Sequence, residues 1–199
     1  MTDARDDGTS LTLLQRLLSS EADAWERFAY LYGPLVRSWA ARRGVVETDA
    51  DDVVQDVFHV VVTKLVGFHR DRPGDSFRGW LHGVTRNVIL RHAERAGQQP
   101  QAPGGTVALR NLNAVADVVA VADEEQDTSA DVNALYRRGM ELVKDEFEER
   151  TWRMFWLHVV DGHTPAEVAG EMGVSAAAVR QAKSRVLRRL KEELGERIE

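Results

Sequence analysis

Residues Thr164–Leu190 read TPAEVAGEMGVSAAAVRQAKSRVLRRL, and this segment holds the most informative pattern in the chain. Thr164 and Glu167 have the spacing of a helix-capping box, and Pro165 stands at the first helical position, where proline is well tolerated. Gly173 follows as a stop signal. The first third of the stretch is therefore predicted to be a short helix that ends at a glycine turn.

A second helix is predicted directly after that turn, with Ser175 as its N-cap. Counted from Pro165, Ala169 is the fifth residue, Gly173 the ninth and Val179 the fifteenth. A helix-turn-helix needs a small residue, a turn and a buried anchor at these places. The spacing therefore predicts this motif.

The second helix combines one apolar face with a strongly basic remainder. The apolar face repeats at helical spacing through Val179, Ala182, Val186 and Leu190. Between Ser175 and Lys191 there is no acidic residue, and the local net charge is +6. The cations left for solvent or phosphate are Arg180, Lys183, Arg185, Arg188 and Arg189. The pattern is typical of a DNA-reading helix. The alternative is a basic helix face that is only exposed to solvent and does not bind DNA.

The composition limits the number of domains, the kinds of site and the cell compartment that the chain allows. The chain has 199 residues, 43% of them hydrophobic, which suits one domain or two small ones. No cysteine is present, which excludes disulfides, thiolate metal sites and zinc fingers. The N-terminal residues contain no apolar run of signal length, and no later stretch approaches a membrane span. We therefore expect a cytoplasmic protein.

Charge is segregated along the chain. The formal net charge of −6 argues against a protein that coats nucleic acid without specificity. Residues 97–134 carry a net charge of −5, in contrast to the basic helix near the C-terminus. This asymmetry predicts local contact with DNA by a chain that otherwise avoids it.

Helical periodicity runs through most of the chain and sustained strand alternation is missing, so the fold class is predicted to be all-α. A first helix covers Leu11–Leu18. A second covers Trp25–Trp39, interrupted or bent near Gly33 and Pro34, and ends at a stop signal closed by Gly44.

A third helix is predicted from Asp49 to Leu65. Its apolar positions are Ala50, Val53, Val54, Val57, Phe58, Val61 and Leu65, and its opposite, acidic face carries Asp51, Asp52, Gln55, Asp56 and His59. Turn residues then predict a loop over Gly67–Ser76. A fourth helix, Phe77–Arg95, places Trp80 in its apolar stripe and leaves a polar, cationic set: Arg78, Arg86, Asn87, Arg91 and Arg95.

Two small helical domains joined by a flexible acidic linker follow from this pattern, with domains at 1–96 and 135–199 and the linker at 97–134. Within the linker, Leu109–Val121 is apolar enough for a short helix or for docking on a partner. After Leu135 one helix is predicted to precede the helix-turn-helix, with Trp152 and Trp156 as core aromatics.

Three segments in this order carry a family resemblance. They are Asp49–Leu65 (DADDVVQDVFHVVVTKL), Phe77–Asn87 (FRGWLHGVTRN) and Thr164–Leu190. Together they resemble the extracytoplasmic-function sigma factors of bacterial RNA polymerase. The resemblance implies a region 2-like domain, a region 4-like domain, and a factor that directs core RNA polymerase to promoters and assists their opening. It also implies promoter DNA as a partner and an anti-sigma factor as a further one.

The resemblance implies that the C-terminal helix enters the major groove of the −35 element. Base contacts are expected from its N-terminal residues, Ser175, Ala176, Ala177, Arg180, Gln181 and Ser184. Phosphate contacts, which fix register without specifying sequence, are expected from Lys183, Arg185, Arg188 and Arg189.

For the −10 element, the resemblance implies that the Phe77–Arg95 helix and the loop before it contact DNA. The expected residues are Arg78, Arg86, Asn87 and Arg91 for backbone and bases, with Phe68 and His69 as stacking groups. Polymerase is expected to bind the acidic face through Asp52, Gln55 and Asp56. A solvated acidic face would look the same in the sequence.

Two other classes of protein fit the sequence less well. A dimeric helix-turn-helix regulator that does not bind core polymerase needs one DNA-reading helix per subunit, whereas this chain offers two cationic helices and an acidic face. An enzyme is not expected, because the six histidines are scattered and no metal-ligand spacing or phosphate-binding glycine loop occurs. No catalytic residue, metal, cofactor, small-molecule substrate or membrane is expected.

Overall fold

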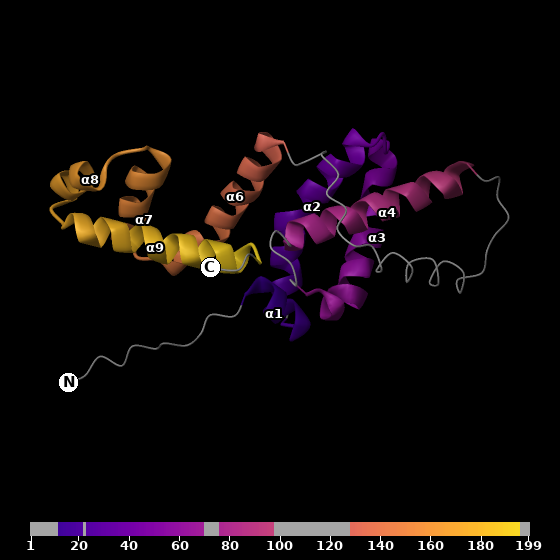
Figure 1. Ribbon diagram of the computed structural model, residues 1–199, viewed down its shortest axis with the longest axis horizontal. Coiled ribbons are helices and arrows are strands. Elements are labelled where there is room, and N and C mark those ends of the chain that lie inside the picture. The colour runs from indigo at the N-terminus through magenta and orange to yellow at the C-terminus, as the bar shows by residue number, and fades with distance from the viewer. Residues whose placement is uncertain (1–11, 22, 70–75, 98–127, 196–199) are drawn as a thin grey trace. The chain divides into compact units, whose positions relative to one another are not determined.

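We describe the chain from a computed structural model that defines residues 12–21, 23–69, 76–97 and 128–195 (Figure 1). Within these ranges all regular structure is helical, which confirms the predicted fold class. Most of the predicted linker, including Leu109–Val121, and the loop residues 70–75 lie outside the described residues. None of the described helices is both long and apolar enough to cross a membrane.

The chain forms two compact units. Residues Trp25–Leu135 make up one, here called the central unit. Residues Met1–Ala24 together with Tyr136–Glu199 make up the other, here called the terminal unit. The domain boundaries placed at residues 96 and 135 by the sequence stay predictions.

In the central unit, helices α2 (Ala24–Arg42), α3 (Glu47–Lys64) and α4 (Phe77–Gly97) surround an aromatic core, and the short 3₁₀ turn η1 (Leu65–Gly67) follows α3. The rings of Phe28 and Tyr32 lie 5.1 Å apart, and the ring of Phe77 lies 6.0 Å from Phe28 and 5.3 Å from Tyr32. All three side chains are buried. This core holds the first turn of α4 against α2.

Two helices of the central unit differ in extent from the sequence prediction. Helix α2 runs without a break through Gly33 and Pro34, so the predicted interruption is wrong, while the alternative of a bend there stays a prediction. Buried Tyr32 and Leu35 flank the proline, and their packing outweighs the lost backbone hydrogen bond. Helix α3 begins two residues before the predicted Asp49, at Glu47.

Helix α6 (Ser129–Val143) begins within the predicted linker range, at a cap built by Thr128 and Asp131. The Thr128 hydroxyl donates to Asp131 Oδ2 at 2.8 Å and accepts from the Asp131 N–H at 3.2 Å. Asp131 also contacts α2, because Ser38 Oγ donates to its Oδ1 at 2.8 Å and Arg42 pairs with its Oδ2. These contacts fix the start of α6 in the central unit.

The terminal unit contains the rest of α6, the 3₁₀ turn η3 (Lys144–Glu146), α7 (Glu149–Phe155), the π-helical turn η4 (Trp156–Val160), α8 (Pro165–Met172) and α9 (Ala176–Glu193). The prediction of one continuous helix before the helix-turn-helix is wrong. Phe147 has extended backbone after η3, and its ring packs against the cluster of Val143, Trp152 and Phe155. Breaking the helix here brings that ring to the core.

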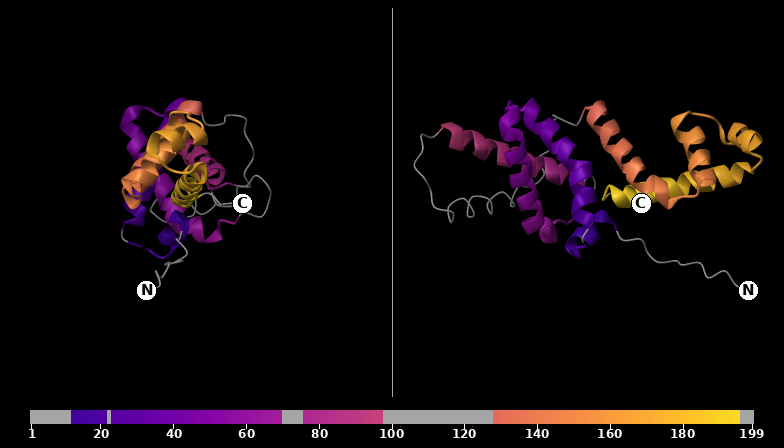
Figure 2. Two further views of the ribbon diagram at one scale, coloured as in Figure 1. Left: turned by 90° about the vertical axis from the view of Figure 1, so that its left-hand side faces the viewer. Right: turned by 180° about the vertical axis from the view of Figure 1, so that it is seen from behind.

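Helix α9 is shared by two apolar clusters. Val186 packs with Val143, Trp152 and Phe155, while Val179 and Ala182 pack with Met154 and Val168. The right-hand view of Figure 2 agrees with these contacts, since α7 and α8 lie on the same side of α9. Trp152 is buried as predicted, but Trp156 is 39% exposed, so its assignment to the core is wrong.

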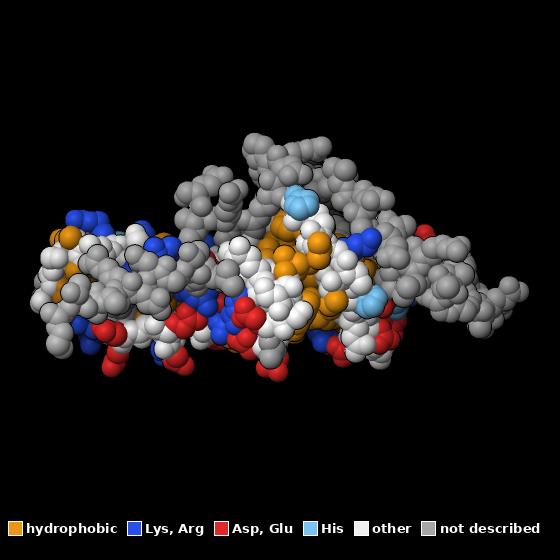
Figure 3. Space-filling model, turned by 90° about the horizontal axis from the view of Figure 1, so that it is seen from below, with side chains coloured by type: hydrophobic (Ala, Val, Ile, Leu, Met, Phe, Trp, Pro, Cys, Tyr) orange, Lys and Arg blue, Asp and Glu red, His pale blue; other side chains and the backbone are white. Residues whose placement is uncertain are grey.

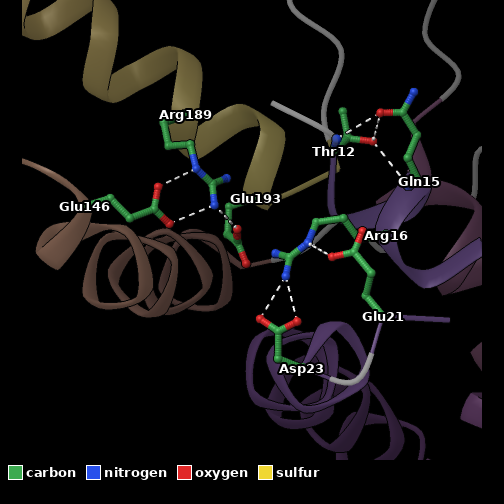
Figure 4. A network of polar contacts seen from close by, with 8 residues as sticks. All are labelled: Thr12, Gln15, Arg16, Glu21, Asp23, Glu146, Arg189 and Glu193. Carbon is green, nitrogen blue, oxygen red and sulfur yellow. Dashed lines mark hydrogen bonds and ion pairs between the residues drawn. The ribbon is translucent and has the colours of Figure 1, made fainter. Parts of the chain in front are cut away.

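Helix α1 (Leu13–Leu18) opens the terminal unit with a second capping box, formed by Thr12 and Gln15 (Figure 4). Arg16 binds Glu21 and Asp23, each at 2.7 Å. Hydrogen bonds to both carboxylates outweigh the cost of burial and raise the pKa of Arg16. The pairs hold the turn that follows α1.

Candidate nucleic-acid interface

The helix-turn-helix has the local geometry that its sequence predicts. The Thr164 N–H donates to Glu167 Oε2 at 2.7 Å, and the Glu167 N–H donates to Thr164 Oγ1 at 3.3 Å. The backbone and side-chain hydrogen bonds with Thr164 lower the pKa of Glu167. Gly173 is left-handed (φ 62°), and Ser175 Oγ accepts from the Ala178 N–H at 3.1 Å. The capping box, the glycine turn and the serine cap are therefore confirmed.

Packing of α9 decides which of its side chains reach solvent. Val179, Ala182, Val186 and Leu190 are buried, as the sequence predicts. On the remaining faces, the predicted DNA-contacting residues Ser175, Ala177, Arg180, Gln181, Ser184, Arg185 and Arg188 are exposed, and Ala176 and Lys183 are half-buried. Arg180, Arg185 and Arg188 form no ion pair with any residue that the structure describes. These guanidinium groups are available to an anionic ligand.

Arg189 is the exception among the cations of α9. Its Nε and Nη2 donate to the two oxygens of Glu146 at 2.6 and 2.8 Å, and Nη2 also lies 2.8 Å from the buried Glu193 (Figure 4). Burial lowers its pKa, but the hydrogen bonds and charges of both carboxylates outweigh burial and raise it. The prediction that Arg189 contacts phosphate is therefore wrong, because its guanidinium group is already paired with two carboxylates.

Two arginines that sequence reasoning did not single out hold α8 in place. Arg153 pairs with Glu171 at 3.1 Å, and Arg150 donates to the carbonyl oxygen of Met172 at 3.4 Å. Both bonds run from α7 to the last turn of α8, next to Gly173. No spacing rule would have found them, since partners about twenty residues apart meet only in the folded unit.

The residues predicted for the −10 element lie on and beside α4. Phe68 is half-buried, with its ring 5.6 Å from Phe77 and 5.3 Å from Trp80, and His69 is exposed. Trp80 is also half-buried, so the prediction that it lies in the core is only partly confirmed. Phe68 thus belongs to an aromatic cluster at the first turn of α4.

The four polar residues of α4 do not form one stripe. Arg78, Arg86, Asn87 and Arg91 are all half-buried. Asn87 and Arg91 are four residues apart and share a face, whereas the angle of about 100° per residue turns Arg78 well away from them. Burial, together with the charge of Arg95, lowers the pKa of Arg91.

The residues predicted for polymerase lie together on α3. Asp52 and Gln55 are exposed and Asp56 is half-buried. With Asp49, and with His92 and Arg95 of α4, they line a hollow of ≈ 520 Å³, here called the acidic hollow. Asp51, the next acid on this face, is paired with Arg37 of α2.

Sequence comparisons agree with this arrangement. A sigma-70 region 2 model matches residues 30–99, and a sigma-70 region 4 model matches residues 148–190. The ECF RNA polymerase sigma factor SigD of Mycobacterium tuberculosis is 32% identical over 164 residues, which cover 80% of this chain and 71% of that protein. The chain belongs to the extracytoplasmic-function sigma factors of the sigma-70 family. It is a transcription initiation factor that binds core RNA polymerase and promoter DNA, and the dimeric regulator is not favoured.

Other relatives are sigma factors as well. The RNA polymerase sigma factor CnrH of Cupriavidus metallidurans is 30% identical over 82% of this chain and 85% of its own length. The ferric citrate uptake sigma factor FecI of Escherichia coli is 26% identical over 77% and 83%. A solved structure of CnrH with the cytosolic domain of CnrY has a TM-score of 0.36 at 23% identity, covering 90% of this sigma factor and 92% of that chain.

Proposed function

We propose that the N-terminal half of α9 reads the −35 element of promoters. The observation that supports this assignment is the row of exposed arginines opposite the buried stripe of α9, which form no ion pair within the described part of the chain. Arg180 has the fork geometry that binds guanine O6 and N7, Gln181 suits adenine, and Ala177 suits a thymine methyl. Ser175, Ala176 and Ser184 complete the base-reading set, and Lys183, Arg185 and Arg188 bind phosphate.

The central unit takes the −10 element in this proposal. Arg78, Arg86, Asn87 and Arg91 supply cations and an amide along α4, and Phe68 and His69 supply ring faces near its start. Unstacked bases of an opened promoter are stabilised by ring faces and by cations on the backbone, and both are present here.

Core polymerase binds the α3 face through Asp52, Gln55 and Asp56 in our proposal. Carboxylates at the rim of an interface steer and align a basic partner rather than provide most of its affinity. We infer that the factor itself performs no catalysis, requires no cofactor or small-molecule substrate, and works in the cytoplasm, where polymerase is found. An anti-sigma factor stays a predicted partner.

Run-off transcription with purified core enzyme on a library of genomic promoter fragments tests the proposal. We expect initiation only at fragments that share a −35 and a −10 element, and only when the factor is present. The proposal fails if no promoter-specific initiation occurs while the protein binds palindromic DNA as a dimer without polymerase.

A further inference from the structure

The acidic hollow is lined by charges of both signs. Arg95 Nη1 lies 3.6 Å from Asp56 Oδ2, and His92 Nε2 lies 3.7 Å from Asp49 Oδ2. Arg95 and His92 both come from the last turns of α4, whereas Asp49 lies in the first turn of α3 and Asp56 near its middle. The proposed polymerase face therefore already contacts basic side chains of its own chain, one of which, Arg95, carries a permanent charge.

These two pairs are looser than others in the protein. Charge-assisted hydrogen bonds usually measure about 2.7–2.9 Å, and Arg189 reaches Glu146 at 2.6 Å while Arg16 reaches Glu21 at 2.7 Å. Arg95 and Asp56, in contrast, stand farther apart, and their side chains are 49% and 39% exposed. Water therefore has access to both groups, and an incoming cation can replace Arg95 without first uncovering a buried charge.

From this geometry we propose that Arg95, with His92 beside it, pairs with the acidic hollow in the free factor and is displaced from Asp56 when core polymerase docks. This inference rests on the proposed function, because it assumes that polymerase binds the α3 face. Exchanging the Arg95–Asp56 pair lowers the net gain from docking, so Arg95 reduces the affinity for core enzyme and favours a partner with a denser array of cations.

The test is the affinity of the full-length Arg95→Ala variant for core polymerase, measured by fluorescence anisotropy at physiological and at high salt. Exposed ion pairs contribute modestly, so we expect about two- to fivefold tighter binding at physiological salt and a smaller gain at high salt. Arg95→Lys keeps the charge and should stay within about twofold of the parent protein.

Lys64→Ala is the matched control for net charge. It removes one cation from the last turn of α3, eight residues and about 12 Å along the helix from Asp56, beyond the screening length at physiological salt. It should not reproduce the gain. In an Asp56→Asn background, Arg95→Ala should likewise give no further gain, because the partner carboxylate is gone.

Three outcomes would overturn the inference: weaker binding of Arg95→Ala, an equal gain from Lys64→Ala, or an undiminished gain in the Asp56→Asn background. Failure of the parent protein itself to bind core enzyme would instead overturn the proposed function. Circular dichroism of each variant establishes that an unchanged or lost affinity does not come from an unfolded α4.

Discussion

Arg180 and Arg188 lie about two turns apart on α9, and both are exposed, yet we assign them different tasks. Arg180 follows the Ser175 cap closely and belongs to the part of the helix that enters the groove in this motif. Arg188 lies nearer the end that packs against η3 through its neighbour Arg189. Position along the helix, rather than exposure, separates a base reader from a phosphate contact.

Arg180→Ala should therefore change the relative use of promoters that differ at the −35 element by about 1–3 kcal/mol. Arg188→Ala should weaken all of them by a similar factor and reduce the salt dependence of binding. Competitive run-off transcription from a set of −35 variants measures both effects. Equal and sequence-independent losses from both substitutions would contradict the division.

Gly173 offers a second test at the scale of one residue. A Cβ at this position would meet nothing within 4 Å, so any cost of substitution comes from the left-handed backbone (φ 62°) alone. Gly173→Ala should destabilise the terminal unit by about 1–2 kcal/mol, and Gly173→Asn by less, because asparagine tolerates this conformation. Urea denaturation monitored by tryptophan fluorescence measures the difference, and equal losses would contradict the backbone explanation.

Single residues were predictable where their surroundings are local. The exposed and buried positions of α9 follow from one helical period, and the caps at Thr164 and Ser175 follow from neighbours three residues away. Arg189 was not predictable, because Glu146, its main partner, lies 43 residues earlier in the chain. The same holds for Trp156, whose exposure depends on how α6 and α7 meet.

At the scale of the elements, the start of α6 contains a carboxyl group, Asp131, whose ionisation makes the stability of the fold depend on pH. Burial disfavours the charged form of Asp131, but hydrogen bonds from Ser38, Thr128 and Arg42 outweigh it and hold the pKa of that carboxyl below its ordinary value of 3.8. A carboxyl with a lowered pKa stabilises the folded state fully above its unfolded pKa, and that stabilisation is lost as the pH falls through the folded value.

The contacts of α6 with α2 should accordingly weaken on acidification below about pH 4. Asp131→Asn should lower the free energy of unfolding at pH 7 and make it less dependent on pH in the acid range, because the amide cannot ionise. Denaturant titrations between pH 3 and pH 7 measure this. A variant that keeps the full acid dependence of the parent would show that Asp131 is not its source.

Element boundaries were harder to predict than element type, for an identifiable reason. Helix α2 passes through Pro34 because buried residues on both sides pack against the core, and the chain breaks at Phe147 because its ring is needed there. Both outcomes depend on tertiary packing, which outweighs local propensity. The acidic face of α3, in contrast, was predicted from its period, while its pairing with His92 and Arg95 was not.

At the scale of the whole molecule, the two proposed DNA-reading surfaces belong to different units, since Arg180 lies in the terminal unit and Arg86 in the central unit. Their contributions should be independent. Arg86→Ala and Arg180→Ala should lower the stability of the promoter complex additively, within about 0.5 kcal/mol, in a double-mutant cycle. A coupling well beyond that value would mean that the two surfaces do not act separately.

The family and the all-α fold could be predicted from three motifs in order, because each motif is a local pattern. The sequence could not predict which residues make up each of the two units, since it does not reveal that Met1–Ala24 groups with Tyr136–Glu199. Surface character was also only partly predictable. Exposed Tyr30, Val62 and Val66 interrupt the polar surface of the central unit, and Figure 3 shows apolar side chains gathered on one face between charged ones.

Because Arg189 and Glu193 tie the far end of α9 into the protein, the proposed base readout is confined to the stretch from Ser175 to about Arg185, and Arg188 lies exposed beyond it as the proposed phosphate contact. Ten residues of helix span about 15 Å, and neighbouring base pairs are stacked about 3.4 Å apart. The footprint of direct readout is thus about four base pairs. So short a sequence recurs by chance throughout a genome, so the −35 element alone cannot specify a promoter, and the −10 element must supply the remaining information.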